Sequence, residues 1–226
     1  LNGTDGTDGD VALAQLEALV HDAAGLLTDD LFFLFQVGSG ADLVMQHGDD
    51  LLGGAQTLSV GFDAEFPPFG FVAADGSYDG FDLAMARELC KRLGWEYKET
   101  AIDWNSKDSE LSSGNINCIW NGFTCTGRED QYTWSDPYVD NSIVLVVKKD
   151  SGIATKADLA GKTVMAQAAS SAADAINGNE AFKSSLKEVI ELADYNTGFM
   201  ELKQGTVDAI AADQGVAAYQ IANNEG

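Results

Sequence analysis

From residue 57 onward, short apolar runs alternate with stretches whose apolar residues recur at helical spacing. Apolar runs of about four to eight residues, rich in Val, Ile and aromatic residues and bounded by Gly, Asn or Asp, are typical of buried strands. The pattern predicts strands at 58–62, 95–102, 116–123, 143–149, 162–167 and 207–213. It predicts helices at 82–93, 109–113, 170–176, 198–205 and 214–221.

Strands that alternate with helices indicate an α/β fold, in which helices cover both faces of a parallel or mixed sheet. The alternation occurs in two successive runs, so we expect two lobes, at 57–141 and 142–226. Asp82 is expected to be the N-cap of the helix that it begins. Segment 182–192 has a mixed pattern that favours neither helix nor strand.

Residues 1–56 differ in charge from the rest, because they hold ten acidic residues and no Lys or Arg. We expect them to form an acidic, largely helical extension, since residues 11–27 carry an amphipathic apolar stripe. The whole chain has a formal net charge of -23, which repels phosphate backbones and argues against a nucleic-acid partner. No window approaches the roughly 20 apolar residues of a membrane helix, and the first residues lack signal-peptide features, which predicts a soluble chain, cytoplasmic or already processed.

Neither the cysteines nor the histidines predict a metal site. Cys90, Cys118 and Cys125 form no CxxC motif, and His21 and His47 stand alone in different segments. The Gly/Asp-rich start matches no register of a calcium-binding loop. Cys90 fits a helix as a small buried hydrophobe, while a disulfide between Cys118 and Cys125 remains open. We therefore expect no metal and no cofactor.

The candidate chemistry lies where predicted strands end, since ligands of open α/β sheets bind beyond the carboxyl ends of the strands. Polar, glycine or aromatic residues stand near these ends. They are Asp63, Glu65, Phe66, Trp104, Asn121, Gly122, Thr124, Arg128, Ser170, Ser171 and Asp213. The serines and Asp213 also suit simple helix caps.

Two of these positions suit an anionic group. Arg128 offers a planar fork of donors to a carboxylate, and a helix that begins at Ser170 and Ser171 offers free backbone N–H groups to the same charge. The alternative for Arg128 is a surface ion pair with Glu129 or Asp130, which would contribute little to stability.

Other positions suit a cation and an apolar chain. The carboxylate of Asp213 and the oxygen of Thr124 could receive an ammonium group, and Phe66 and Trp104 supply flat apolar walls. A small molecule with a carboxylate, an ammonium group and a side chain held between aromatic rings is a free amino acid.

Several sequence stretches carry a resemblance to a known family. In chain order they are VGFDAEFPPFGF, DGSYDGFDLAMARELCKRLG, LSSGNINCIWNGFTCTGRED followed by YTWSDPYVDNSIVLVVKK, ADLAGKTVMAQAASSA, and LKQGTVDAIAADQGVAAY. Through their order and spacing, residues 57–222 resemble the bacterial extracellular solute-binding proteins of polar amino-acid ABC transporters, which have the type II periplasmic binding fold.

The resemblance implies how the backbone of an amino acid is held. Arg128 would bind the α-carboxylate, assisted by backbone N–H groups near Ser171 and in the Thr124 region. Asp213, the Gly122 carbonyl and the Thr124 hydroxyl would hold the α-ammonium group.

The side chain of the ligand has its own implied contacts. Phe66 and Trp104 would stack on it, Asp63 would meet its polar end, and Asn121 stands where the family often has a small residue and would help to select the ligand. Asp63 and Glu65 could favour a cationic ligand. Arginine, lysine, histidine, glutamine and cystine all stay open.

The resemblance also implies partners and a location. Family members close two lobes on the amino acid, dock to a membrane permease and work outside the cytoplasm, in the periplasm or at the cell surface. A lipid anchor would have to be carried by residues outside this chain.

Three features depart from the family pattern. Arg128 follows Thr126 by two residues where the usual spacing is three. The sequence ends near the point where the family's chain returns to the first lobe, so the C-terminal part of that lobe is expected to have no counterpart. Residues 1–56 match no part of the family, and we expect this extension to pack on the first lobe.

The sequence is also compatible with other functions. The same fold serves as the ligand-binding domain of amino-acid sensors or receptors, although residues 138–163 contain no channel insertion. An enzyme that resembles cyclohexadienyl dehydratase would need a general acid or base, for which Asp63 or Glu65 are candidates. A shortened chain that folds poorly is a further alternative.

Overall fold

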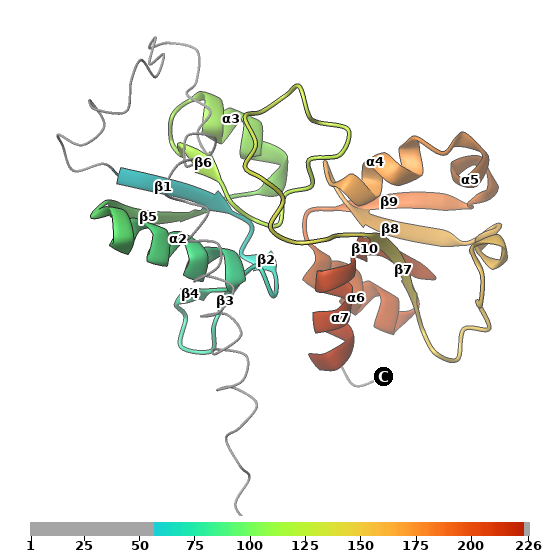
Figure 1. The fold of residues 1–226 in the computed structure, drawn as a ribbon. Helices are drawn as coiled ribbons and strands as arrows, with labels where there is room; N and C mark the ends of the chain where they lie inside the picture. Colours follow the sequence, from blue (N-terminus) through green and yellow to red (C-terminus); the bar gives the residue numbers. More distant parts are fainter. Residues whose placement is uncertain (1–56, 224–226) are drawn as a thin grey trace, which may run out of the picture.

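The computed structural model describes residues 57–223, which form two main sheets with helices packed on each and a third, small sheet (Figure 1). In the first sheet, the order is β5-β1-β6 and all strands are parallel. These strands are β1 (Thr57–Phe62), β5 (Glu96–Ala101) and β6 (Cys118–Ile119). Helix α2 (Phe81–Leu93) packs on one face and α3 (Lys107–Ser112) on the other (Figure 1). We call this half lobe 1.

The turn-rich segment after β1 forms a small antiparallel sheet beside α2, with strands β2 (Glu65–Phe66), β3 (Gly70–Val72) and β4 (Tyr78–Asp79). The core of lobe 1 joins alternate residues of β1 to the apolar stripe of α2, as the period-2 pattern of a strand and the helical stripe require. Its buried members include Leu58, Val60, Phe62, Leu83, Ala86 and Leu89.

The second sheet, which we call lobe 2, has the order β7-β10-β8-β9. Its strands are β7 (Ile143–Val147), β8 (Thr163–Gln167), β9 (Glu188–Leu192) and β10 (Ala209–Asp213), and only β7 runs antiparallel to its neighbour. The helices of this half are η4 (Lys156–Leu159), α4 (Ser171–Asn177), α5 (Glu180–Ser185), α6 (Tyr195–Gln204) and α7 (Gln214–Asn223).

Strand β10 shows why lobe 2 is a three-layer structure. Its residues are buried throughout, and they alternate between two cores: Ala209 and Ala211 pack toward α4 and α5, whereas Ile210 and Ala212 pack toward α6 and α7. A strand with apolar residues on both faces needs a helical layer on each side. Figure 1 shows these two helical layers on opposite faces of the sheet.

Most predicted elements are present, and two predictions need correction. Helix α2 begins at Phe81 with Gly80 as its N-cap, because the Asp82 carboxylate is buried and accepts a hydrogen bond from the Gly122 backbone N–H instead of capping the helix. The strand predicted at 116–123 is only Cys118–Ile119. The mixed segment 182–192 divides between α5 and β9, which explains its double pattern.

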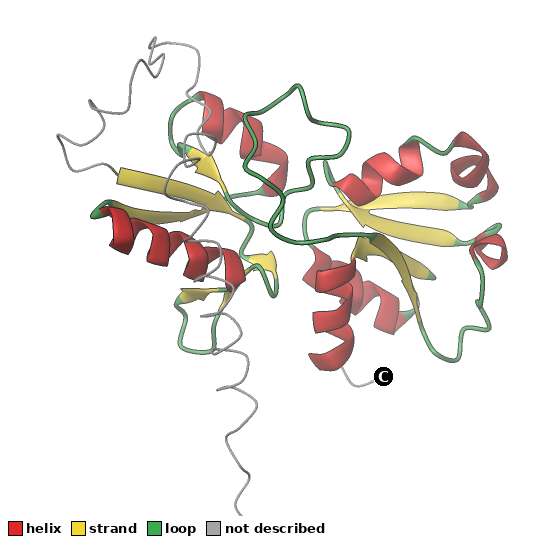
Figure 2. Ribbon diagram, viewed as in Figure 1, coloured by secondary structure: helices red, strands yellow, loops and turns green. Residues whose placement is uncertain are grey.

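A long loop, residues 120–142, connects β6 to β7 and runs between the lobes (Figure 2). The lobe boundary predicted between residues 141 and 142 falls just before β7. The predicted extension at 1–56 lies outside the described residues. Within the described part, all three cysteines are free thiols, with Cys90 and Cys118 buried, and no helix is both long and apolar enough to cross a bilayer.

Candidate ligand-binding site

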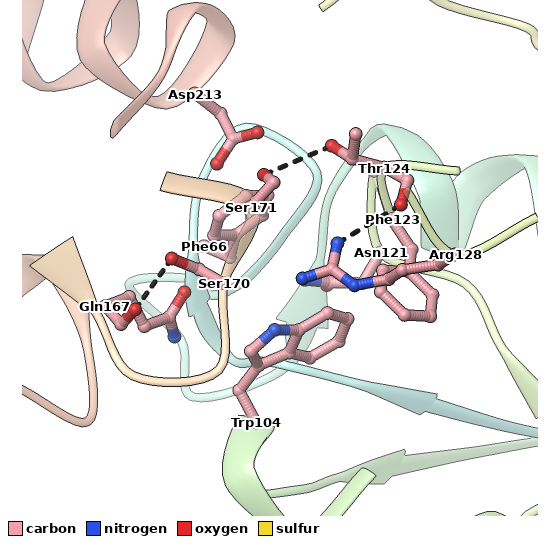
Figure 3. Close-up of a pocket in the computed structure, with 11 residues that line it drawn as sticks. Phe66, Trp104, Asn121, Phe123, Thr124, Arg128, Gln167, Ser170, Ser171 and Asp213 are labelled. Carbon is pink, nitrogen blue, oxygen red and sulfur yellow. Dashed lines mark hydrogen bonds between the residues drawn. The ribbon is translucent and has the colours of Figure 1, made fainter. Parts of the chain in front are cut away.

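A cavity between the two lobes gathers most of the residues that the sequence indicated (Figure 3). Its lining comprises Phe66, Trp104, Asn121, Gly122, Phe123, Thr124 and Arg128 from lobe 1 and its loop, and Gln167, Ser170, Ser171 and Asp213 from lobe 2. Nine of the eleven candidates from the sequence are in this lining. Asp63 and Glu65 do not line the cavity, and Phe123 and Gln167 are additions.

Most of these residues lie at or just after the carboxyl ends of strands. Strand β8 ends at Gln167 and β10 ends at Asp213, while β6 leads directly into the loop that holds Asn121 to Arg128. Trp104 begins the short helix η3 (Trp104–Ser106), which follows β5. Parallel strands bring their carboxyl ends to the same edge of a sheet. In each lobe this edge faces the cavity.

Arg128 is a buried cation that is held from several sides. Its Nη1 donates to the Thr124 carbonyl at 3.2 Å, its Nη2 donates to Asp174 Oδ2 at 2.6 Å, and the guanidinium lies 5.3 Å from the Phe123 ring centroid. The side chain is only 9% exposed, so the alternative of a solvated surface pair with Glu129 or Asp130 is wrong. The Glu129 carboxylate accepts the Gly127 N–H instead.

The start of α4 lies across the cavity from this loop. Ser170 is the N-cap: its Oγ accepts from Ala173 N at 3.2 Å and donates to the Gln167 carbonyl at 2.6 Å. The Ser171 hydroxyl donates to Thr124 Oγ1 at 3.3 Å, which links the lobes (Figure 3). Both predicted roles of this pair, cap and cavity lining, are therefore combined in one turn.

Asp213 is a buried carboxylate at the end of β10. It is 4% exposed, and burial raises its pKa. Its Oδ1 accepts from Asn141 Nδ2, and the same amide donates to Thr124 Oγ1 at 3.2 Å. A carboxylate that is buried to this degree gains from a cationic ligand, because the cation offsets the cost of removing the charge from water.

Asp63 lies behind Gln167 instead of facing the cavity. Its Oδ2 accepts from Gln167 Nε2 at 2.5 Å and its Oδ1 accepts from Glu65 N at 2.8 Å. Burial, reinforced by the charges of Asp194 and Glu65, raises the pKa of Asp63 to about 6. The direct contact with the ligand that we expected of Asp63 is thus blocked by the Gln167 amide.

The loop after β6 is held by hydrogen bonds to other parts of the chain. Asn121 Oδ1 accepts from Asp63 N at 3.2 Å. Gly122 has a φ of 56° and donates its N–H to Asp82 Oδ2 at 2.5 Å and to the Tyr138 hydroxyl at 3.3 Å. Burial raises the pKa of Asp82 to about 7.

Aromatic rings form the walls. Trp104 meets Phe123 edge to face, with centroids 5.0 Å apart, and Phe66 stacks on Phe69 at 5.7 Å. The Lys107 ammonium lies 5.2 Å from the Trp104 centroid and 6.0 Å from the Phe123 centroid, and buried aromatic contacts of this kind restrain the rings.

Comparison with known proteins decides the family. Residues 58–213 match the model of the bacterial extracellular solute-binding proteins, family 3. The chain belongs to this family.

Named relatives of this solute-binding chain are amino-acid-binding proteins. It is 36% identical over 115 residues to the arginine-binding extracellular protein ArtP of Bacillus subtilis, covering 50% of this chain and 45% of ArtP. It is 31% identical over 163 residues to the L-cystine-binding protein TcyJ of Escherichia coli, covering 70% of this chain and 59% of TcyJ. The chain thus spans about half the length of these relatives.

A solved structure agrees with the fold. A substrate-binding protein of an ABC uptake transporter from Streptococcus pneumoniae, determined with bound histidine, superposes with a TM-score of 0.71 at 37% identity. The match covers 74% of this chain and 70% of that one. The expected family and its two-lobed α/β fold are confirmed.

Two lining residues of this solute-binding chain were missed from the sequence. Gln167 is the last residue of β8, so the strand-end rule that selected its neighbour Ser170 could have found it. Phe123 was counted as part of a strand that in fact ends at Ile119, and no signal in the apolar pattern separates the two states.

Proposed function

We propose that this chain binds a free polar L-amino acid in the cavity between its lobes and delivers it to an ABC transporter permease for uptake. The observation that carries the proposal is the pair of opposite buried charges, Arg128 and Asp213, in the lining of one cavity. A zwitterion brings an opposite charge to both groups at once, whereas a simple anion or cation brings one to only one of them.

Each backbone group of the ligand has a named receptor. The α-carboxylate binds the free edge of the Arg128 guanidinium and the Ser171 turn, and the α-ammonium group binds Asp213, the Gly122 carbonyl and the Thr124 hydroxyl. Support comes from the hydrogen bonds that already tie Thr124 to both sides, through Arg128 Nη1 and through Ser171. The rings of Phe66 and Trp104 enclose the side chain.

Binding requires the lobes to open and close. In the present arrangement, hydrogen bonds join lobe 1 to lobe 2 around the cavity. They include Arg128 with Asp174, Gln167 with Asp63, and Lys107 with the Ala169 backbone carbonyl at 3.4 Å. These bonds enclose the site, so ligand entry needs their rupture and closure re-forms them.

The proposed role is binding and not catalysis. Neither candidate acid lines the cavity. Asp63 has both carboxylate oxygens engaged, and Glu65 accepts a hydrogen bond from the Asn196 amide. We place the protein outside the cytoplasm, in keeping with its family of extracellular solute-binding proteins.

A thermal-shift screen of the twenty amino acids, cystine and ornithine tests the proposal. A ligand at about 100 times its Kd stabilises the folded state by about 2.7 kcal/mol, which is a clear rise in Tm. Arg128→Ala should abolish the shift, while Arg92→Ala, which removes an exposed pair with Glu88, should retain it. Absence of a shift for every compound with folded protein would overturn the proposal.

A further inference from the structure

The orientation of the Gln167 amide is fixed by its neighbours. Its Nε2 donates to Asp63 Oδ2 at 2.5 Å and to the Ala193 carbonyl at 2.9 Å, and both partners are acceptors. The nitrogen therefore points away from the cavity, and Oε1 has no partner among residues 57–223. Since Gln167 is 1% exposed and lines the cavity, this oxygen is an acceptor available to a ligand.

The Asn121 amide is fixed in the opposite sense. Its Oδ1 accepts the backbone N–H of Asp63 at 3.2 Å, which assigns the oxygen to that side. Nδ2 is left without a partner in the described part of the chain, and Asn121 is 2% exposed and lines the cavity. This nitrogen is an available donor.

The two amides flank one residue, because the backbone of Asp63 binds Asn121 and its carboxylate binds Gln167. Figure 3 shows Gln167 and the guanidinium of Arg128 on opposite sides of the cavity. A ligand whose α-carboxylate sits on Arg128 therefore extends its side chain toward Gln167. The acceptor of Gln167 and the donor of Asn121 both belong to the lining that surrounds this side chain.

We propose that the ligand's side chain ends in an uncharged primary carboxamide, as in glutamine or asparagine. The carboxamide NH₂ donates to Gln167 Oε1, and its carbonyl oxygen accepts from Asn121 Nδ2. Both vacant hydrogen-bonding groups of the lining are then satisfied, as buried polar groups must be.

Charged side chains satisfy only one of the two groups. A guanidinium or ammonium group has no acceptor for Asn121 Nδ2, and the carboxylate of Asp63 that could neutralise it is occupied by Gln167 and Glu65. A side-chain carboxylate has no donor for Gln167 Oε1. A buried polar group left unpaired weakens binding by roughly 10- to 100-fold.

Calorimetric titration of the whole chain with L-glutamine, L-asparagine, L-glutamate and L-arginine tests this inference, which rests on the proposed function. We expect glutamine or asparagine to bind about 10- to 100-fold more tightly than glutamate and arginine. Glutamate or arginine binding at least as tightly as both amides overturns the inference but leaves amino-acid binding intact. Binding of none of the four, nor of any other amino acid, overturns both.

Asn121→Asp sharpens the test. It keeps the acceptor for Asp63 N and replaces the vacant donor with a second acceptor, so the preference should shift by at least about tenfold from glutamine toward arginine. Asn105→Asp adds the same charge at an exposed position of lobe 1 and should leave the preference unchanged. Equal preferences in the Asn121→Asp and unaltered proteins, with both folded by near-UV circular dichroism, would contradict the assignment.

Discussion

Lobe 1 presents its site residues mainly on a loop, whereas lobe 2 presents them at strand ends and at a helix start. Asn121 to Arg128 follow the two-residue strand β6 and belong to no regular element. Gln167 and Asp213, by contrast, are the last residues of β8 and β10, which pair with each other in parallel.

The two halves therefore fix their side chains by different means. In lobe 2, ladder hydrogen bonds of the sheet set the positions, and packing on both faces holds them. In lobe 1, the loop depends on individual side-chain contacts, from Asp82 at Gly122, from Phe123 at Arg128 and from Asp174 across the cavity. Substitutions at these contacts should disturb the loop, while those at strand ends should act on the ligand alone.

The largest effect is expected in lobe 2, at the end of β10. Asp213→Asn keeps the shape and an acceptor for Asn141 but removes the charge that we propose receives the α-ammonium group. Affinity should fall by about 100- to 1000-fold with little change in Tm of the ligand-free protein, since loss of a buried charge partner costs about 2–5 kcal/mol of binding.

Calorimetry with the best ligand measures this change. Glu188→Gln, at an exposed position of β9, removes a charge from the same lobe and should leave affinity unaltered. An Asp213→Asn protein that binds as tightly as the unaltered chain would show that the carboxylate does not receive the ligand.

In lobe 1, substitution of the buried Asp82 should change how the free energy of unfolding depends on pH. The pKa of Asp82 is raised by burial from 3.8 to about 7, so the folded state binds its proton more tightly than the unfolded chain does. The contribution of this group to the free energy of unfolding is therefore fully present below pH 4 and is lost as pH rises toward 7, by an amount on the order of 2–4 kcal/mol. Asp82→Asn should remove this decline.

Urea unfolding at pH 5 and pH 8 tests the prediction. The Asp82→Asn protein should still lose some stability as pH rises, because Asp63 also has a raised pKa, of about 6. This remaining loss should be smaller. Asp75→Asn is a suitable control, because hydrogen bonds from Ser77 lower the pKa of this exposed carboxyl and place its effect below pH 4. The same pH dependence in the Asp82→Asn and unaltered proteins would contradict the assignment.

A smaller effect is expected where the two halves meet. Asp174→Asn weakens the ion pair that holds Arg128 from the α4 side, but the Asp174 side chain is 65% exposed. Solvent screening limits such a pair to about 1 kcal/mol, so affinity should fall by about fivefold, chiefly through faster ligand dissociation.

Stopped-flow measurement of the dissociation rate separates this effect from a general loss of stability. Asp174→Glu should restore most of the slow rate, and Asp150→Asn, at an exposed position of lobe 2, should not alter it. A rate unaffected by Asp174→Asn would show that the pair does not take part in closure.

The same difference explains what the sequence could predict. The apolar runs at 162–167 and 207–213 predicted β8 and β10 well, because a strand buried on both faces has a continuous apolar signature. Ser170 and Asp213 followed from these strands. The predicted strand at 116–123 was too long, since Trp120 and Phe123 look like strand residues although they pack from a loop.

Contacts between distant residues lie outside the reach of such patterns. The sequence indicated Asp63 as a ligand contact, but Gln167, which is 104 positions away, takes its carboxylate. Nothing local to Asp82 shows that it binds Gly122 in place of capping α2. The residue types at the site could be predicted, whereas the direction of each amide and carboxylate depends on pairing across the fold.

The smallest prediction concerns the left-handed residue that each half places beside the cavity. Lobe 1 uses Gly122, with a φ of 56°, and lobe 2 uses Ala169, with a φ of 54°. A residue with a side chain loses about 1–2 kcal/mol of stability in this left-handed region, and glycine avoids that loss. Glycine also makes the unfolded chain more flexible, which lowers stability by about 0.4–1 kcal/mol. Ala169→Gly should therefore stabilise the protein by about 0.5 kcal/mol in urea unfolding.

Two matched substitutions complete the comparison. Ala168→Gly, one position earlier and without a positive φ, should destabilise by about 0.4–1 kcal/mol through the entropy term alone. Gly122→Ala should destabilise by about 1–2 kcal/mol or more, because its new Cβ meets left-handed strain and lies 3.2 Å from the Phe69 ring. If Ala169→Gly destabilises as much as Ala168→Gly, the turn before α4 is not strained, and the two halves differ only in how their regular elements support the site.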